Sequence, residues 1–323
     1  MSQLFQPAAD RRVDILSFGN PNIDLVFGVE QVPLVDQKCL GRRLGTFAGG
    51  TTANVACAAG CLGARTCVYG QIGDDLEGVF LKAEFERFSV STEHLQVVPG
   101  ARSSAAIIMV DGTGEKALIY VPMAERPWGE SLPVNLFSQS RVIYTMPYEI
   151  RTFAKVAQLA HQQGADVVID VETAMAPNVD RLNALLGLSD VVFFSETSFR
   201  AVLGLPPTID LMRQLLRRGP RAVVVTLGAR GALAVTHDAA VEQPGFPAKV
   251  VDTTGAGDCF NGALLAATLE GQSLQRAMRF ACAAASISTS AIGARSMLPD
   301  RKTIASLLQS WPPARGQTAG LRQ

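Results

Sequence analysis

The sequence has no excess of charge of either sign, because 29 lysines and arginines balance 29 aspartates and glutamates among its 323 residues. A chain without net charge has no overall field to attract nucleic acid or an acidic membrane, although a local basic patch can exist. Its apolar runs are short and interrupted, and none reaches the ~20 residues that a membrane-spanning helix needs. The N-terminal MSQLFQPAADRR lacks the pattern of a secretion signal. We expect no nucleic-acid or membrane partner and a cytoplasmic location.

Patterns that bind metals or form disulfides are also scarce. The six cysteines show no Cys-x-x-Cys spacing, and only three histidines accompany them. Cys57 and Cys61 would share one face of a helix, at a spacing of four residues. Small buried thiols in a reducing compartment explain them better than a metal site does.

What the sequence does have, from residue 141 onward, is a regular alternation of strands and helices. Apolar runs such as VVIDV and VVVTL are typical of strands buried on both faces. The alternation predicts an α/β fold whose mainly parallel sheet is covered by helices on both sides. Two regions outside this pattern, about 25–47 and 105–121, look like hairpins, and we expect them to pair into a small sheet that forms a lid. The whole chain, 1–323, is expected to be one domain with a flexible tail at 312–323.

Two local expectations complete the outline. The run KVVD, 249–252, is predicted to be a strand that leads into a helix. In the amphipathic helix expected at 75–89, the side chains of Phe80, Phe85 and Phe88 are assigned to the core.

The stretch VDTTGAGDCFNG, 251–262, places glycines at the start of a predicted helix. The first N–H groups of a helix lack partners, so the amides of Gly255, Ala256 and Gly257 are suited to bind an anion. Asp258 is then either a helix cap or a base that takes a proton from a hydroxyl while the amides hold a transferring phosphoryl group. Neither a GxGxxG nor a P-loop pattern fits the stretch. Cys259 could alternatively be an activated thiol.

This GxGD sequence, with GNPNID near the N-terminus and FAGGTTANVACAAGCLGA at a helix start, resembles the PfkB or ribokinase-like family of carbohydrate kinases over about residues 13–300. The resemblance implies a ribokinase-like three-layer α/β core with a β-sheet lid. It also implies ATP as the phosphoryl donor, Mg²⁺, activation by K⁺ and a sugar as the acceptor. Asp258 would be the catalytic base and the amides of 255–257 the anion hole.

The resemblance also implies roles for other residues. On the substrate side these are Asn22, Asp24, Gly49, Gly50 and Asn54; at the nucleotide, Ser195, Thr226, Gly228, Gly231 and Cys282; at the monovalent cation, Asp252, Thr254 and the carbonyls around 288–293, Gly293 included. Simpler interpretations exist for several of them. Asp24 could end a strand turn, Asn54 could cap a helix, and the glycines at 228 and 231 could belong to ordinary turns.

Three departures from the family pattern bear on substrate and metal. Thr51 stands where ribokinases often have lysine, and Cys282 stands where an asparagine is often found near adenine. The family's NxxE motif falls at SETS, 195–198, so both its asparagine and its glutamate are missing, although Glu196 is adjacent. Mg²⁺ often has few protein ligands, so the change puts metal dependence in question rather than abolishing activity.

The segments SETSFRAVLG and RFACAAASIS and the 105–121 hairpin most resemble ketohexokinases and sulfofructose kinases. We therefore expect a ketose or an acidic ketose derivative as acceptor. Four cations in or beside the lid segments could clamp a sulfonate or carboxylate, or could simply form a solvated face: Lys38, Arg42, Arg43 and Arg102. A nucleoside kinase of the same fold and a catalytically weak sugar sensor are the alternatives. A lid with an apolar face also predicts a homodimer through the lid.

Overall fold

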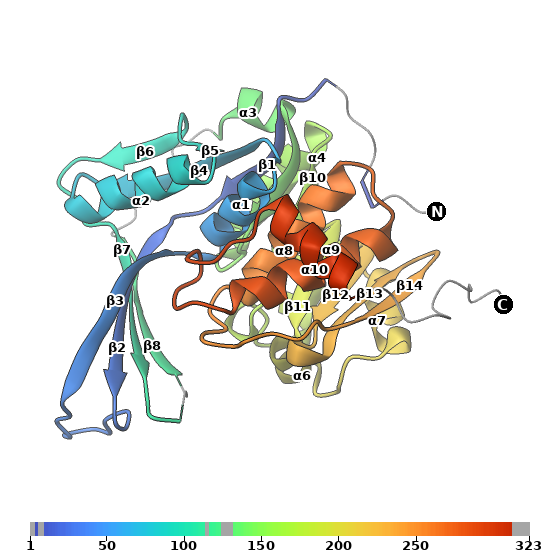
Figure 1. Ribbon diagram of the computed structural model, residues 1–323. Helices are drawn as coiled ribbons and strands as arrows, with labels where there is room; N and C mark the ends of the chain where they lie inside the picture. Colours follow the sequence, from blue (N-terminus) through green and yellow to red (C-terminus); the bar gives the residue numbers. More distant parts are fainter. Residues whose placement is uncertain (1–3, 6–9, 114–115, 124–131, 312–323) are drawn as a thin grey trace.

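The computed structural model describes residues 4–5, 10–113, 116–123 and 132–311. A large, mainly parallel sheet lies between two layers of helices, and a small second sheet projects to one side (Figure 1). This confirms the α/β fold with a lid that the sequence predicted. The expected tail at 312–323 lies outside the described residues.

The large sheet has the order β14-β13-β12-β11-β10-β9-β1-β4-β5, and β6 pairs with β4. Strands from β12 to β5 run parallel to their neighbours, whereas β13 and β14 are antiparallel additions at one edge. The bounds are β1 Val13–Phe18, β4 Thr66–Gly73, β5 Val90–Ser91, β6 Leu95–Val98, β9 Ser140–Thr145, β10 Asp166–Asp170, β11 Val191–Ser195, β12 Ala222–Thr226, β13 Gly231–Thr236 and β14 Ala240–Pro244.

Helices cover both faces because the parallel strands are apolar on both. In β1, Ile15 packs into one apolar cluster and the next residue, Leu16, packs into another. The first cluster includes residues of α1 (Thr51–Cys61), α8 (Ala256–Leu269), α9 (Leu274–Ser288) and α10 (Arg301–Ser310). The second includes residues of α3 (Val134–Ser138), α4 (Ile150–Gln162), α5 (Val179–Gly187), α6 (Glu196–Leu203) and α7 (Ile209–Leu216). Helix α2 (Leu76–Arg87) contacts β4 and β5, and two short 3₁₀ turns are η1 (Thr173–Met175) and η2 (Gly228–Arg230).

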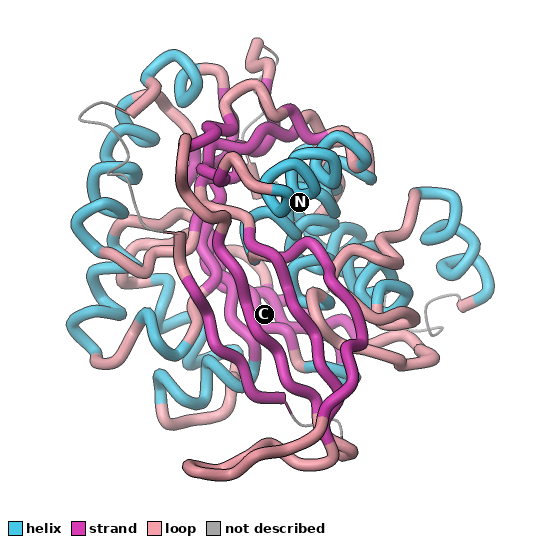
Figure 2. Tube along the Cα trace, turned by 90° about the vertical axis from the view of Figure 1, so that its left-hand side faces the viewer, coloured by secondary structure: helices cyan, strands magenta, loops and turns pink. Residues whose placement is uncertain are grey.

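The lid is a four-stranded sheet with the order β3-β2-β7-β8. Its strands are β2 (Asn22–Val29), β3 (Gly41–Gly49), β7 (Ser104–Val110) and β8 (Lys116–Val121). Two antiparallel hairpins join through a parallel pairing of β2 with β7. The two hairpin regions that stood outside the sequence alternation therefore do pair, and Figure 2 shows their strands crossing in front of the core.

Both local expectations need correction. Residues 249–252 form no strand, because the N–H groups of Val251 and Asp252 donate to the carbonyl of Thr289, beyond α9, instead of to a sheet. Phe85 and Phe88 are buried, as predicted, but Phe80 is 39% exposed. Five helical positions turn about 140° around the axis, so the rings of Phe80 and Phe85 cannot share one buried face.

No helix within the described ranges has the length and apolar character needed to cross a membrane.

Candidate active site

Helix α8 begins with a loop that only glycine can form. Gly255 is the residue before the helix, in the left-handed conformation with φ of 74°. A Cβ at this position would lie 2.5 Å from the Cβ of Ala294, so space and backbone both require glycine. Ala256 and Gly257 form the first turn, whose N–H groups have no acceptors within the helix. This is the local geometry that an anion hole needs.

Asp258 is the third residue of α8 and does not cap it. Its Oδ2 accepts a hydrogen bond of 2.7 Å from Nδ2 of Asn54, which lies in the first turn of α1. Burial raises the pKa of Asp258 to about 7; the Asn54 hydrogen bond opposes this shift, and the charges of Asp170 and Glu172 add to it. A carboxyl group that titrates near neutral pH beside anion-binding amides is suited to accept a proton.

A buried arginine fixes the orientation of Asn54. Arg295 is 3% exposed; its Nε donates to Oδ1 of Asn54 at 2.8 Å and its Nη2 donates to the carbonyl of Gly49 at 2.7 Å. Because a guanidinium can only donate, Asn54 turns its amide oxygen toward Arg295 and its amide nitrogen toward Asp258. The guanidinium also lies 5.4 Å from the ring centroid of Phe85. Asn54, predicted from the resemblance to bind substrate, thus contacts the predicted base.

Asp24 on β2 belongs to the same neighbourhood. Nδ2 of Asn22 donates to its Oδ1 at 2.6 Å, and burial raises the pKa of Asp24 to about 6 against the effect of that bond. A Cβ at Gly49 would lie 2.4 Å from both Asp24 oxygens, so glycine leaves the room that the carboxylate occupies. Gly50 follows with φ of 96° and precedes α1. Through Gly49 and Arg295, the expected sugar side connects to the expected base.

Next to Asp258 along α8 is a set of hydrogen-bonded polar side chains that the sequence analysis missed. Asn261, one turn further along α8, donates to Oδ2 of Asp170 at 2.8 Å and to the hydroxyl of Tyr144 at 3.1 Å. Burial raises the pKa of Asp170 to about 6. The signal that could have identified Asp170 is its position. It is the acidic residue that ends β10, directly after the apolar residues 167–169.

Four of the five predicted nucleotide residues lie around the ends of two neighbouring strands. Ser195 ends β11, and Thr226 ends β12 in register with it. The Ser195 hydroxyl caps α6 by accepting the N–H of Ser198. Gly228 has φ of 59° and open space where a Cβ would be, whereas a Cβ at Gly231 would clash with the backbone of β14. The first of these glycines is therefore the one that leaves a surface open to a ligand.

Cys282 lies on α9, which contacts β13, the strand that begins at Gly231. It packs in the apolar cluster of α8 and α9, and burial raises the pKa of its thiol to about 12. Burial likewise raises the pKa of Cys259 to about 12, which argues against an activated thiol beside Asp258.

Glu196 does not replace the acid missing from the SETS segment. Its carboxylate is engaged by Arg200 at 2.9 Å and, on its other oxygen, by Arg230. Among the described residues no group of three or more acidic, histidine or cysteine side chains is arranged to hold a metal ion. Any Mg²⁺ here would thus need phosphate and water for most of its ligands.

The predicted monovalent-cation residues do come together. Oδ1 of Asp252 accepts the N–H of Thr254 at 3.0 Å and its hydroxyl at 2.7 Å, and Oδ2 accepts the N–H of Gly293 at 2.9 Å. Burial would raise the pKa of Asp252, but these donors and Lys116 outweigh it and lower the pKa to about 2. Lys116, on the lid, is another residue that the sequence analysis missed.

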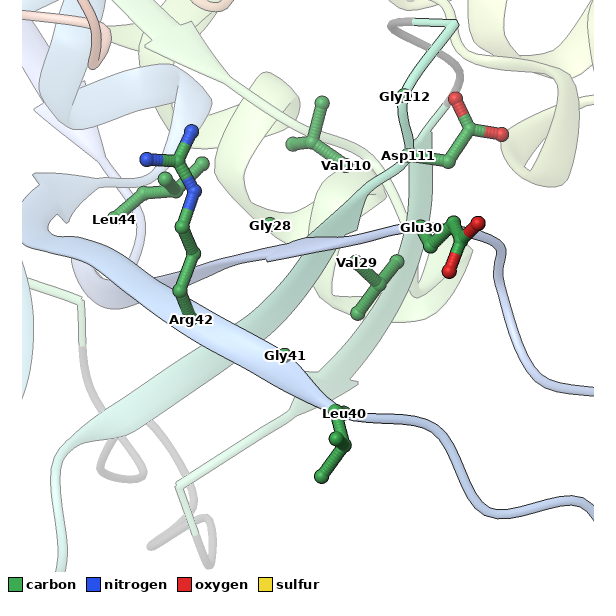
Figure 3. Close-up of a pocket in the computed structure, with 10 residues that line it drawn as sticks. All are labelled: Gly28, Val29, Glu30, Leu40, Gly41, Arg42, Leu44, Val110, Asp111 and Gly112. Atoms are coloured by element: carbon green, nitrogen blue, oxygen red, sulfur yellow. The ribbon is translucent and has the colours of Figure 1, made fainter.

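A separate hollow of about 500 Å³ lies at the far end of the lid sheet. Figure 3 shows Arg42 rising from β3 toward Leu44, with the carboxylates of Glu30 and Asp111 on the other side of the hollow. Arg42 pairs with Gly28, four residues along β2 from Asp24, or about 13 Å at strand spacing. The other expected clamp residues, Lys38, Arg43 and Arg102, are exposed. The lid cations therefore do not converge on Asp24.

An α/β core with a lid, and an aspartate at a glycine-rich helix start, are together the features of a sugar kinase. Comparison with known proteins agrees. The chain belongs to the pfkB family, because the sequence model of that family, described as "pfkB family carbohydrate kinase", matches residues 13–301. It is a carbohydrate kinase, a phosphotransferase with a hydroxyl acceptor.

Three relatives illustrate the similarity in sequence. The chain is 29% identical over 307 residues to a ribokinase of Arabidopsis thaliana, covering 90% of this chain and 80% of that protein. It is 27% identical over 304 residues to a ribokinase of Bacillus subtilis, covering 91% and 99%. It is 24% identical over 290 residues to a nucleoside kinase of Methanothermobacter thermautotrophicus, covering 89% and 93%.

Among solved structures, Arabidopsis ribokinase complexed with ribose and ATP superimposes with a TM-score of 0.79 at 28% identity, covering 92% of this chain and 99% of that one. The relatives named here are ribokinases and a nucleoside kinase. The comparisons thus support the family that the sequence indicated, and do not single out the ketohexokinase and sulfofructose kinase subgroup.

Proposed function

We propose that the protein transfers the γ-phosphoryl group of ATP to a hydroxyl of a neutral sugar, with Asp258 as the base and the amides of 255–257 as the anion hole. The observation that carries this proposal is the hydrogen bond of 2.7 Å from Asn54 to Asp258, which places the base of α8 against the start of α1. Asp24 and Asn22 would hold sugar hydroxyls on the lid side of the same network.

Each part of the site has a step to perform. Asp258 takes the proton of the sugar hydroxyl while the hydroxyl oxygen forms a bond to the γ-phosphorus. The bond from that phosphorus to the bridging oxygen of the β-phosphate breaks, and ADP is the leaving group. The amides at the start of α8 stabilise the charge on the equatorial oxygens during transfer. Asn54 holds the carboxylate in place, and the lid residues exclude water that would otherwise compete as acceptor.

ATP would bind at the ends of β11 and β12, against Ser195, Thr226 and the open surface at Gly228. The ATP in the Arabidopsis ribokinase structure supports this choice of donor. Mg²⁺, where present, supplies positive charge to the phosphates. With Glu196 engaged by Arg200 and Arg230, it would take most of its ligands from phosphate and water.

Ribose is our proposed acceptor, in place of the ketose expected from sequence. Two of the relatives are ribokinases, and the lid cations expected to clamp an acidic ketose lie exposed or at the far hollow. The pocket residues that remain, Asp24, Asn22 and Asn54, offer neutral or anionic hydrogen-bonding groups suited to hydroxyls.

The test is sugar-dependent ADP release from ATP, measured as kcat/KM across ribose, deoxyribose, fructose, sulfofructose, ketogluconates and nucleosides. We expect ribose to exceed the others by about tenfold or more, which is ~1.4 kcal/mol of transition-state preference. A nucleoside or an acidic ketose winning by that margin would overturn the acceptor and leave the kinase. ADP release with none of them would favour the sensor alternative.

A further inference from the structure

The first residue of lid strand β8 reaches the loop in front of the anion hole. Nζ of Lys116 lies 2.7 Å from Oδ1 of Asp252 and also contacts the hydroxyl of Thr254. The side chain of Asp252 is 14% exposed and that of Lys116 is 36% exposed. This ion pair joins residues 136 positions apart, so it ties the edge of the lid to the start of α8.

Asp252 organises both segments that shape the anion hole. One carboxylate oxygen holds the backbone and hydroxyl of Thr254, which directly precedes the left-handed Gly255. The other oxygen holds the N–H of Gly293, whose neighbour Ala294 is the residue against which Gly255 packs. The position of Gly255, and of the amides after it, therefore depends on this carboxylate.

A carboxylate in this position favours a cation beside it, and the family resemblance implied K⁺. The structure places an ammonium group against the same carboxylate. Lys116 supplies a unit positive charge and N–H donors to two side-chain oxygens of the predicted cation residues, Asp252 Oδ1 and Thr254 Oγ1. Among the described residues, Lys116 is the one that forms an ion pair with Asp252.

We propose that Lys116 supplies, from the lid, the positive charge that a monovalent cation would otherwise supply at Asp252, and that it is a positioning residue for the anion hole. Its catalytic consequence rests on the proposed kinase function. Because the ammonium belongs to β8, it reaches Asp252 only when the lid lies against the α8 loop. Ordering the anion hole and seating the lid over the sugar are then coupled.

The test compares turnover in equal concentrations of K⁺ and tetramethylammonium, which is too large to enter the site. The wild type and Lys38→Met, an exposed lid lysine chosen as the matched control, should turn over equally in both salts. Lys116→Met should lose about tenfold in tetramethylammonium and regain most of that in K⁺, because K⁺ can fill the vacated position. A wild type that requires K⁺, or a Lys116→Met enzyme equally active or equally impaired in both salts, would overturn the proposal.

A second readout needs no catalysis. In thermal unfolding without substrates, K⁺ should raise the Tm of Lys116→Met relative to tetramethylammonium and leave that of the wild type unchanged. The absence of any such shift in the variant contradicts a cation position at Asp252. A wild type that shows no turnover with any sugar would instead contradict the proposed function, so the two failures are distinguishable.

Discussion

At the residue scale, the pKa of Asp258 is set by its burial, by nearby carboxylates and by nearby donors or positive charge. Burial raises it to about 7, Asp170 and Glu172 add to the rise, and Asn54 and Arg295 oppose it. A base works only in its unprotonated form, so kcat/KM of the wild type should fall as pH drops below about 7. The effects of the neighbours have opposite signs, and these can be separated by mutation.

Replacing a like charge should move the acid limb of the pH profile downward. In Asp170→Asn the nearby negative charge is gone, so the pKa of Asp258 falls and activity persists to lower pH. The measurement is kcat/KM against pH between about 5 and 9, where a single carboxyl with a raised pKa shows its limb. A profile unchanged from that of the wild type would mean that Asp258 does not control it.

Arg295 should act in the opposite direction. Arg295→Met removes a positive charge and frees the amide of Asn54, so the acid limb should move to higher pH and kcat should fall by about tenfold. Arg295→Lys keeps the charge but not the two fixed donors, and should restore the limb more than the rate. Loss of activity without any shift of the limb would indicate a structural role alone.

The site could be predicted from sequence only where a local pattern carries it. Gly255 and Asp258 follow a rule of helix starts and were found on that ground. Arg295 acts on Asn54 across 241 positions, and Lys116 acts on Asp252 across 136. A single charged residue in a loop or at a strand start has no local signature, so only the fold identifies these two.

At the element scale, the site depends on the close approach of α1 and α8. A Cβ at Gly262 would lie 2.7 Å from the carbonyl oxygen of Val55 and 2.8 Å from the Cβ of Ala58. Glycine at this crossing therefore lets the two helices pack with their first turns together. That packing brings Asn54 within hydrogen-bond distance of Asp258.

Filling this contact should damage both stability and catalysis. We expect Gly262→Val to lose about 1–3 kcal/mol of unfolding free energy through overpacking, and to lower kcat by displacing Asn54 from Asp258. In the matched control Gly187→Ala, the new Cβ meets only the Arg218 carbonyl at 3.8 Å, in ordinary contact. Thermal unfolding and turnover of both variants decide; a Gly262→Val enzyme as stable and active as the control would contradict the argument.

The elements themselves were largely predictable, because alternation and helical spacing are local. The strands and helices after residue 141 appear in the predicted order, apart from the wrongly assigned 249–252 and the unpredicted β14. Strands β5 and β6 have two and four residues, too few to show a period. The apolar run at 249–252 resembles a strand, but its partner is the loop after α9, which no local pattern reveals.

At the scale of the whole molecule, the lid presents an apolar face that is covered only at one end by the described residues, where Leu25 packs against a buried cluster. Leu25 on β2, Ile107 on β7 and Ile119 on β8 lie side by side across the sheet. Two residues further along β2 and β7, Phe27 lies beside Met109. All five are at least partly exposed, and Ile119 is 54% exposed. Alternation places Val26, Ala106 and Ile108 on the opposite face, where they are buried.

We predict that this face is covered by the lid of a second copy, giving a homodimer at micromolar concentration. Ile119→Lys should shift the protein to monomer, because a charge would be buried in the contact. Leu118→Lys, on the opposite face of the same strand, is the control and should leave the dimer intact. Sedimentation velocity measures both, and a monomeric wild type would contradict the prediction.

The proposal that Asp258 is the base is tested most directly by Asp258→Asn, which keeps the size of the side chain and its hydrogen bond from Asn54. Turnover with the best sugar and ATP binding should be measured on the same preparation. The account predicts that kcat falls by roughly 10²–10⁴-fold while the Kd for ATP stays within about twofold of the wild type. A variant that retains near-full kcat would contradict it and leave Asp258 as a structural residue of α8.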